Sequence, residues 1–309
     1  MRKQNPALNL TTYLMARWAV MMLGFFPVNA NLRTARAFGS LMWAFDKKHR
    51  DRALENLTQS FPDKPRAELE RIARRSIEHF CELGIDVMFT TRVISVETWH
   101  RFVHPKNFQS TVDIVLRGNG AILLTGHYGN WEILGYTLAV LGIRTYSVVR
   151  PFDNPHFDTW LLGVREKKGQ IILSKRGVTT TAQEVLANKG ILGFIADQNA
   201  GPKGMFVPFF GKLASTYKSI GLLAMQYNVP IIIGYARRRG DNFDFEVGVG
   251  DIIYPEDWKN QPDELYYITE RYTRAIEMIV REDPTQYLWI HRRWKTRPKD
   301  EIAETPGQV

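Results

Sequence analysis

The sequence has only one cysteine, Cys81, so an intramolecular disulfide is excluded. A lone thiol is typical of a protein that folds in a reducing compartment. Cys81 falls among apolar residues at helical spacing, which predicts a packed thiol in the core. The chain also lacks a Pro/Gly/Ser-rich linker, an internal repeat and a low-complexity tract. We therefore expect one main domain, residues 51–309, behind an N-terminal helical segment, residues 1–50.

Several short motifs of enzymes are absent. There is no Gly-x-Ser-x-Gly elbow, so an α/β-hydrolase is disfavoured. There is no Walker A loop, no dinucleotide fingerprint and no His-Glu-x-x-His zinc pattern. The histidines at 49, 79, 100, 104 and 156 do not show the spacing of a ligand set. The sequence therefore implies neither a metal nor an organic cofactor.

Long apolar runs are also missing. The longest one, Trp18–Val28, is shorter than the roughly 20 residues that a spanning helix needs. No small-residue cleavage site follows it, which disfavours a removed signal peptide. Together with Arg17, it remains compatible with a helix lying in a membrane interface, a spanning helix or a buried helix. Six basic residues follow between positions 33 and 52, against two before Tyr13, so a spanning helix would leave the main domain in the cytoplasm.

The net charge of +9 would suit three classes of binding partner: nucleic acid, anionic lipid or an acidic protein. No helix-turn-helix, zinc-finger or RNP-type signature is present, and the basic residues are spread along the chain. We expect no nucleic-acid partner. A membrane surface is the favoured interpretation because of the apolar segment near the N-terminus.

The most informative motif present is Gly-His-Tyr-Gly-Asn-Trp-Glu, residues 126–132, directly after the apolar run at 121–125. His127 has the side chain whose ordinary pKa lies nearest neutrality, so it is a candidate general base. Five residues on a continuous helix would turn Glu132 away from His127. The two meet more easily if Gly129 makes a turn and Asn130 caps a helix that starts at Trp131.

The remaining pattern alternates strands and helices, which predicts an α/β sandwich around a mixed, largely parallel sheet, with an N-terminal membrane-associating helical segment. Expected strands are residues 121–125, 143–149, 170–173, 191–196, 230–236, 243–249 and 286–290. Expected helices are residues 65–90, 131–141, 156–168, 178–189, 215–227 and 263–281. Two prolines in residues 202–210 predict an apolar loop there, which either lines a channel or packs in the core.

Three polar residues each follow a predicted strand. They are His127, Arg150 and Asp197. Ligands of open α/β sheets collect at the carboxyl ends of strands, where these side chains would converge. That convergence predicts a functional site without reference to any family.

The ordered set of motifs resembles the bacterial lauroyl/myristoyl lipid A acyltransferases of the lysophospholipid acyltransferase superfamily. The resemblance begins with the His-x-x-x-x-acid block and covers roughly residues 10–300. The other motifs that fit are residues 56–62 (NLTQSFP), 150–155 (RPFDNP), 196–202 (ADQNAGP), 206–210 (FVPFF) and 284–298 (PTQYLWIHRRWKTRP). The resemblance implies an O-acyltransferase whose catalytic domain is residues 51–309.

Such an enzyme would move a fatty acyl chain from a thioester donor to a hydroxyl of a membrane lipid, such as a lipid A precursor. His127 would be the base. Glu132 is the first choice to orient it, and Asp197 is the rival. Two alternatives stay open: another acceptor (lysophospholipid, glycolipid or aminolipid), and a catalytically silent lipid-binding module.

Arg150 is suited to hold a phosphate of either substrate, although it can equally pair with Asp153. Lys175 and Arg176 match the superfamily's basic block in type and position. We also count Asn130 and Gln198 among the candidate substrate-binding residues. The resemblance implies acyl carrier protein or acyl-coenzyme A as donor, and a location at the inner membrane with the catalytic domain on its cytoplasmic face.

Overall fold

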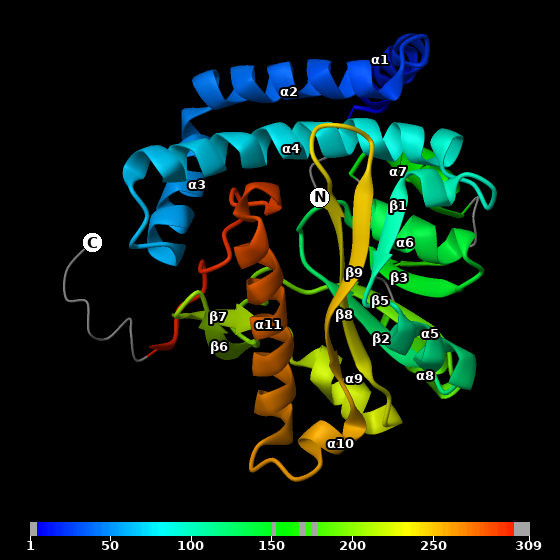
Figure 1. Cartoon of the computed structure of the whole chain (residues 1–309), viewed down its shortest axis with the longest axis vertical. Helices are drawn as coiled ribbons and strands as arrows, with labels where there is room; N and C mark the ends of the chain where they lie inside the picture. The colour runs from blue at the N-terminus through cyan, green and yellow to red at the C-terminus, as the bar shows by residue number, and fades with distance from the viewer. Residues whose placement is uncertain (1–4, 150–152, 167–170, 175–177, 300–309) are drawn as a thin grey trace.

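A computed structural model describes residues 5–149, 153–166, 171–174 and 178–299. Its centre is a seven-stranded sheet in the order β1-β9-β8-β2-β5-β3-β4 (Figure 1). Neighbours from β8 through β4 are all parallel, whereas β9 runs antiparallel to β8. The strands are β1 (Val103–Lys106), β2 (Ala121–Thr125), β3 (Thr145–Val149), β4 (Ile171–Ser174), β5 (Ile191–Ile195), β8 (Ile231–Arg238) and β9 (Phe245–Ile253). The α/β class and the mostly parallel sheet are therefore confirmed.

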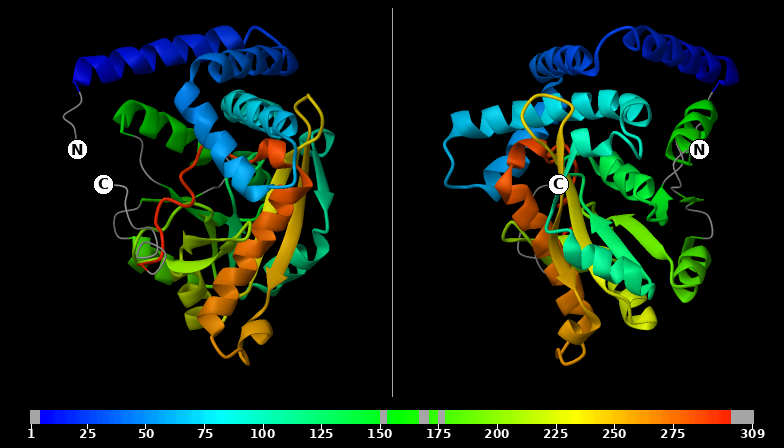
Figure 2. Two further views of the ribbon diagram at one scale, coloured as in Figure 1. Left: turned by 90° about the vertical axis from the view of Figure 1, so that its left-hand side faces the viewer. Right: turned by 45° about the vertical axis from the view of Figure 1, so that its right-hand side comes forward.

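Helices cover both faces of this sheet. The helices α9 and α11 pack on one face, and α5 and α6 pack on the other (Figures 1 and 2). The longest helix, α4, crosses the carboxyl ends of the parallel strands. The helices are α1 (Pro6–Leu23), α2 (Val28–Phe45), α3 (Lys47–Ser60), α4 (Arg66–Val93), α5 (Gln109–Arg117), α6 (Trp131–Val140), α7 (Pro155–Glu166), α8 (Val178–Ala187), α9 (Ser219–Tyr227), α10 (Pro255–Trp258) and α11 (Glu264–Glu282).

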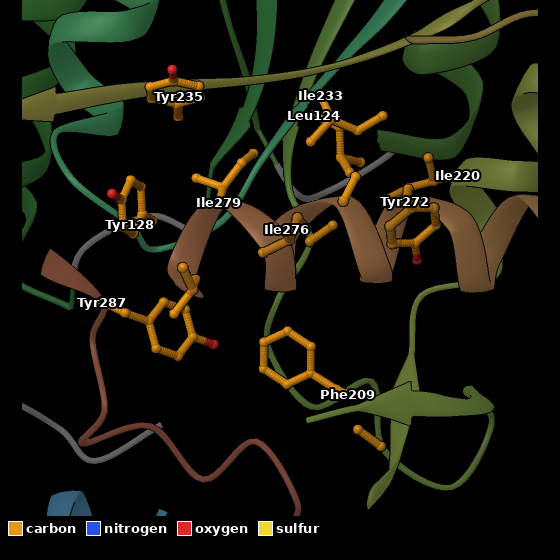
Figure 3. Close-up of a cluster of buried hydrophobic side chains, with 14 of the residues drawn as sticks. Leu124, Tyr128, Phe209, Ile220, Ile233, Tyr235, Tyr272, Ile276, Ile279 and Tyr287 are labelled. Carbon is orange, nitrogen blue, oxygen red and sulfur yellow. The ribbon is translucent and has the colours of Figure 1, made fainter. Parts of the chain in front are cut away.

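The core follows the period of two that a sheet covered on both faces requires. Ile122 and Leu124 of β2 belong to the cluster under α11, whereas Ala121 belongs to the cluster on the opposite face. Figure 3 shows the first cluster, where Ile276 and Ile279 of α11 point toward the sheet. This packing fixes β2, the strand that leads into the His127 motif.

Two sequence predictions about strands were wrong. Residues 205–209 form β6 (Met205–Phe209), which pairs with β7 (Lys212–Thr216) in a two-stranded antiparallel ribbon. Both strands of such a ribbon are edges, so Pro208 can sit opposite Leu213 with its nitrogen on the unpaired side. Phe209 and Phe210 are buried in the core, which decides against a channel role for them.

The predicted strand 286–290 is the second wrong prediction. In that segment only Tyr287 makes a bridge, opposite Tyr128, and residues 284–286 form a short 3-10 helix. Its aromatic residues are buried by packing with the β6–β7 ribbon and Phe61. The predicted helix 215–227 is shortened to α9 because its first residues belong to β7.

The two N-terminal helices are built differently. Leu32 of α2 is buried in a cluster shared with α4 and α6, and a Cβ on Gly39 would lie 2.5 Å from the Glu78 Cα. Helix α1 has no buried residue and lies at the outside of the molecule (Figure 2). Cys81 of α4 is half-buried, with its Sγ 3.6 Å from the Met42 sulfur of α2.

Across the described ranges, no helix is both long and apolar enough to span a membrane. The division of the chain at residue 50 stays a prediction.

Candidate active site

The register of β2 and β5 brings His127 and Asp197 together. The two strands are parallel neighbours, with Thr125 opposite Ile195. His127 stands two residues after Thr125, and Asp197 stands two residues after Ile195. Two side chains at the same offset beyond paired parallel strands leave the same edge of the sheet side by side.

The loop after β2 turns back sharply to start α6. Gly129 has φ of 56°, and a Cβ there would lie 2.0 Å from the Ala236 carbonyl oxygen, so only glycine fits. Asn130 is the N-cap of α6, with its side-chain oxygen accepting from the Ile133 N–H at 2.9 Å. The expected turn at Gly129 and cap at Asn130 are confirmed.

His127 makes two hydrogen bonds to the Asp197 carboxylate. Its Nδ1 lies 2.6 Å from Oδ1, and its backbone N–H donates to Oδ2 at 2.8 Å. Burial alone would raise the pKa of Asp197, but the charge interaction and hydrogen bonds with His127 outweigh it and lower that pKa. An ionised carboxylate only accepts hydrogen bonds, so we assign the ring proton to Nδ1, which leaves the Nε2 lone pair free.

Three further side chains surround the imidazole. The Gln198 amide nitrogen lies 3.2 Å from His127 Nε2, and it donates in the assigned tautomer. The Trp131 ring meets the imidazole edge-on, with centroids 5.0 Å apart. The His291 ring centroid lies 4.6 Å away. Burial lowers the pKa of His291 to about 4, assisted by the proximity of His127, so His291 is neutral at pH 7.

A cavity of about 350 Å³ opens beside His127 and runs between α5, α6 and the sheet. Polar groups of His127, Glu132 and Gln198 line it near the end of β2. Most of the remaining lining comes from apolar and small residues: Phe108, Leu123, Leu124, Leu134, Leu138, Val148, Ile172, Phe194, Ile195, Ile232, Val249, Gly135, Gly193, Gly234 and Gly248. The arrangement places a hydrogen-bonded imidazole at an elongated apolar space.

The sequence was then compared with known proteins. The family model described as "Bacterial lipid A biosynthesis acyltransferase" matches residues 1–296. The chain belongs to this family. It is similar to "Lipid A biosynthesis lauroyltransferase" of Escherichia coli (strain K12), with 24% identity over 91% of this chain and 90% of the relative. It is also similar to the "Lipid A biosynthesis myristoyltransferase" of the same organism, with 27% identity over 83% and 78%.

Membership of this acyltransferase family makes the chain an O-acyltransferase, as the sequence motifs predicted. A base, a partner that orients it and an apolar chain-binding space are parts that acyl transfer to a lipid requires. Among the described residues, His127 and Asp197 are a histidine and a carboxylate joined by a hydrogen bond beside such an apolar space.

The other predicted site residues lie in different places. Glu132 is in the first turn of α6 and lines the cavity, while the Nδ1 partner of His127 is Asp197. Asn130 is fully buried, and both ends of its amide have protein partners, Ile133 and Asp86. With no exposed surface and both amide ends occupied, Asn130 does not fit the predicted substrate-binding role. Arg150, Lys175 and Arg176 lie outside the described residues.

Little in the sequence indicated that the segment 286–297 contacts the site. It makes two hydrogen bonds to the loop after β2: the Leu288 N–H donates to the His127 carbonyl, and the Gly129 N–H donates to the Gln286 carbonyl. Asn199 and Thr296 are joined through two hydrogen bonds. The only signal for this role was the clustering of basic and aromatic residues in one segment.

Arg293 is the most unusual member of that segment, since this charged residue is only 2% exposed. It donates to the Gln198 and Ser215 carbonyls and to the Thr216 hydroxyl. Burial lowers the pKa of Arg293, and the nearby Asp197 charge acts in the opposite direction. Arg293 therefore ties the loop after β5 to the β6–β7 ribbon with a positive charge behind Asp197.

Proposed function

We propose that this protein transfers a fatty acyl chain from a thioester to a hydroxyl of a lipid A precursor, with His127 as the general base. The observation that carries the proposal is the His127–Asp197 pair at the mouth of an apolar cavity. The family match over residues 1–296 supports the lipid acceptor.

In the proposed reaction, the Nε2 of His127 takes the proton from the acceptor hydroxyl. The hydroxyl oxygen attacks the thioester carbonyl carbon, the carbon–sulfur bond breaks, and the thiolate leaves with the proton returned by His127. Asp197 holds Nδ1–H and stabilises the imidazolium that forms, as the carboxylate of a catalytic triad does. The acceptor hydroxyl displaces the Gln198 amide, which donates to Nε2 in the structure.

The cavity would take the acyl chain. Its apolar lining suits a hydrocarbon, because burying each CH₂ group contributes about 0.8 kcal/mol. Glu132 lies at the polar end of the same space. We assign it to the acceptor rather than to the imidazole, since the Nδ1 of His127 already has a partner.

The membrane would be reached through α1. Large apolar side chains stand exposed on it and on the turn behind it: Leu8, Leu10, Leu14, Met15, Trp18, Met21, Phe25 and Phe26. Exposed apolar groups of this number mark an interaction surface. We place the protein on the cytoplasmic face of the inner membrane, with α1 lying in the interface.

Acyl carrier protein is the proposed donor, with acyl-coenzyme A as the alternative. The net charge of +9 favours an acidic carrier because opposite charges accelerate encounter. Arg150, Lys175 and Arg176 remain proposed contacts for phosphate groups of the substrates.

The test is acyl transfer by the full chain in lipid nanodiscs, followed by mass spectrometry of the product lipid. We expect lauroyl or myristoyl carrier protein to acylate a lipid A precursor, and His127→Ala to lower turnover by about 10²–10⁴-fold. Lysophospholipid, glycolipid and aminolipid acceptors run in parallel decide the acceptor class. Binding of lipid without consumption of any thioester would instead identify a silent lipid-binding module.

A further inference from the structure

A buried polar cluster lies directly behind the loop that carries His127. It consists of His79, Glu82 and Asp86 of α4, with Arg238 at the end of β8, and all four are less than 5% exposed. The three α4 residues are spaced i, i+3 and i+7, so they share one face of the helix. That face is otherwise the apolar stripe that packs on the core, with Ile72 and Ile85 among its members.

The cluster makes direct hydrogen bonds to the loop. The Asn130 side-chain nitrogen donates to the Asp86 Oδ2 at 2.8 Å. The His79 Nε2 lies 3.1 Å from the Gly129 carbonyl oxygen and donates to it. Burial lowers the pKa of His79 to about 3, so this histidine acts as a neutral donor. Arg238 forms an ion pair with the same Asp86 oxygen, Oδ2.

These charges are costly to bury. Burial raises the pKa of Asp86 to about 6, although the Arg238 charge opposes the shift. Apolar residues of similar volume often stabilise a fold as well as a buried ion pair does. Stability therefore does not account for a carboxylate at this position, whereas the geometry of Asn130 does.

Asp86 decides which way the Asn130 amide points. A carboxylate accepts hydrogen bonds, so it draws the amide nitrogen toward itself. The amide oxygen is then directed at the Ile133 N–H, which it caps at 2.9 Å. The Asn130 N–H also donates to the Ala236 carbonyl at 2.7 Å, so the residue joins α4, α6 and β8. His127 is three residues away in the same short loop.

We propose that Asp86 is a positioning residue for acyl transfer: paired with Arg238, it holds the Asn130 amide and thereby keeps the His127 loop in line with Asp197. The proposal rests on the assignment of His127 as the base. A displacement of about 1 Å in a catalytic group can cost roughly 10²-fold in rate, so the link acts on turnover.

The first test is Asn130→Ser. Serine is about as good an N-cap as asparagine, so α6 keeps its cap while the donor to Asp86 is lost. We expect kcat to fall at least about tenfold with KM nearly unchanged, because the substrate cavity is not altered. Asp263→Ser is the matched control: Asp263 is the exposed N-cap of α11, far from the loop in sequence and contact. It should leave kcat at the wild-type value.

The second test is a charge swap. Asp86→Asn removes the negative charge and one of the two acceptor oxygens and leaves Arg238 without its anion, so its kcat should fall together with its Tm. The double variant Asp86→Asn/Asn130→Asp restores one carboxylate and one amide at the same two positions. We expect the double variant to recover at least tenfold in kcat over Asp86→Asn.

His127→Ala is measured first, to separate the two proposals. Near-normal turnover in His127→Ala refutes the assigned base and the positioning role with it. If His127→Ala is inactive while Asn130→Ser keeps wild-type kcat, the positioning role alone is overturned. A double variant no more active than Asp86→Asn overturns it as well, even if Asp86→Asn folds poorly.

Discussion

Replacing Asp197 by asparagine separates the two carboxylates that compete for the role of orienting His127. The substitution preserves size and removes the charge. The amide has one acceptor oxygen, whereas two donors of His127, its backbone N–H and its Nδ1–H, each use a carboxylate oxygen in the structure. With the amide oxygen on the backbone N–H, the amide nitrogen faces Nδ1 and cannot accept its proton. The imidazole then prefers the other tautomer, with its proton on Nε2. In that tautomer Nε2 cannot take the proton of the acceptor hydroxyl.

The expected loss follows from that change of tautomer. A triad carboxylate replaced by its amide lowers kcat by about 10⁴-fold, and loss of a general base by about 10²–10⁴-fold. We therefore expect Asp197→Asn to lower kcat by at least about 10²-fold, equivalent to roughly 3 kcal/mol in the activation free energy. Glu132→Gln should be milder, because Glu132 lies at the cavity and does not hold Nδ1.

The assay compares single-turnover acyl transfer in four variants: His127→Ala, Asp197→Asn, Glu132→Gln and the double His127→Ala/Asp197→Asn. Residues that act as one unit are non-additive, so the double variant should be barely slower than His127→Ala. Circular dichroism and Tm check that each variant is folded. The reasoning is refuted if Glu132→Gln matches the His127→Ala defect while Asp197→Asn stays near wild type.

Four further outcomes are expected. Gly129→Ala should abolish turnover and lower Tm by several degrees because its Cβ would overlap the Ala236 carbonyl, whereas Gly118→Ala, also at positive φ but with open space around it, should cost only about 1–2 kcal/mol in chemical denaturation. Raising the salt concentration should slow transfer from acyl carrier protein much more than from acyl-coenzyme A, and equal slowing would contradict electrostatic steering of the carrier. Deleting residues 1–30 should release much of the protein from membranes in fractionation with little loss of Tm, since α1 buries no residue and the buried residues of α2 all lie after residue 30. The pKa of Asp197 is lower in the folded state than its ordinary value of 3.8, so its ionised form stabilises the fold above about pH 4; that contribution should fade as pH falls further, and the Tm gap between wild type and Asp197→Asn should narrow there.

Much of the fold was readable from local patterns. The strands β2, β5 and β8 are short apolar runs that end in a turn signal or a polar residue, and all three were predicted within two residues of their ends. The α11 stripe, with Ile268, Ile276 and Ile279 buried, followed from its helical period. In these segments the hydrophobic period and the tertiary burial agree.

The wrong predictions concern segments that are buried by contacts with distant parts of the chain and not by their own hydrophobic period. Tyr287 and Trp289 belong to a short apolar run, residues 287–290, as in a buried strand, yet what buries them is the β6–β7 ribbon and the aromatic cluster of Phe61 and Phe210. Pro208 argued against a strand, but a two-stranded ribbon has only edges and tolerates it. Both cases depend on contacts between distant parts of the chain, which periodicity does not report.

The same distinction between local and long-range contacts explains which part of the site could be predicted. The five-residue spacing of His127 and Glu132 is a local signal, and it drew attention to the nearer carboxylate. Asp197 is seventy residues away, and it reaches the imidazole because β5 pairs with β2. The order of strands in a sheet cannot be deduced from a single sequence, so the choice between Glu132 and Asp197 had to stay open.

Strand pairing also gives each carboxylate a separate place. Asp197 leaves the sheet at the same offset as His127 and meets its Nδ1 side. Glu132 starts α6, after the turn at Gly129, and faces the cavity on the substrate side. In the proposed mechanism, the His-x-x-x-x-Glu block of this chain therefore joins the base to a group on the acceptor's side of the cavity, while the partner of the base comes from the neighbouring strand. Asp86 belongs to the same arrangement, because it acts on the loop between His127 and Glu132.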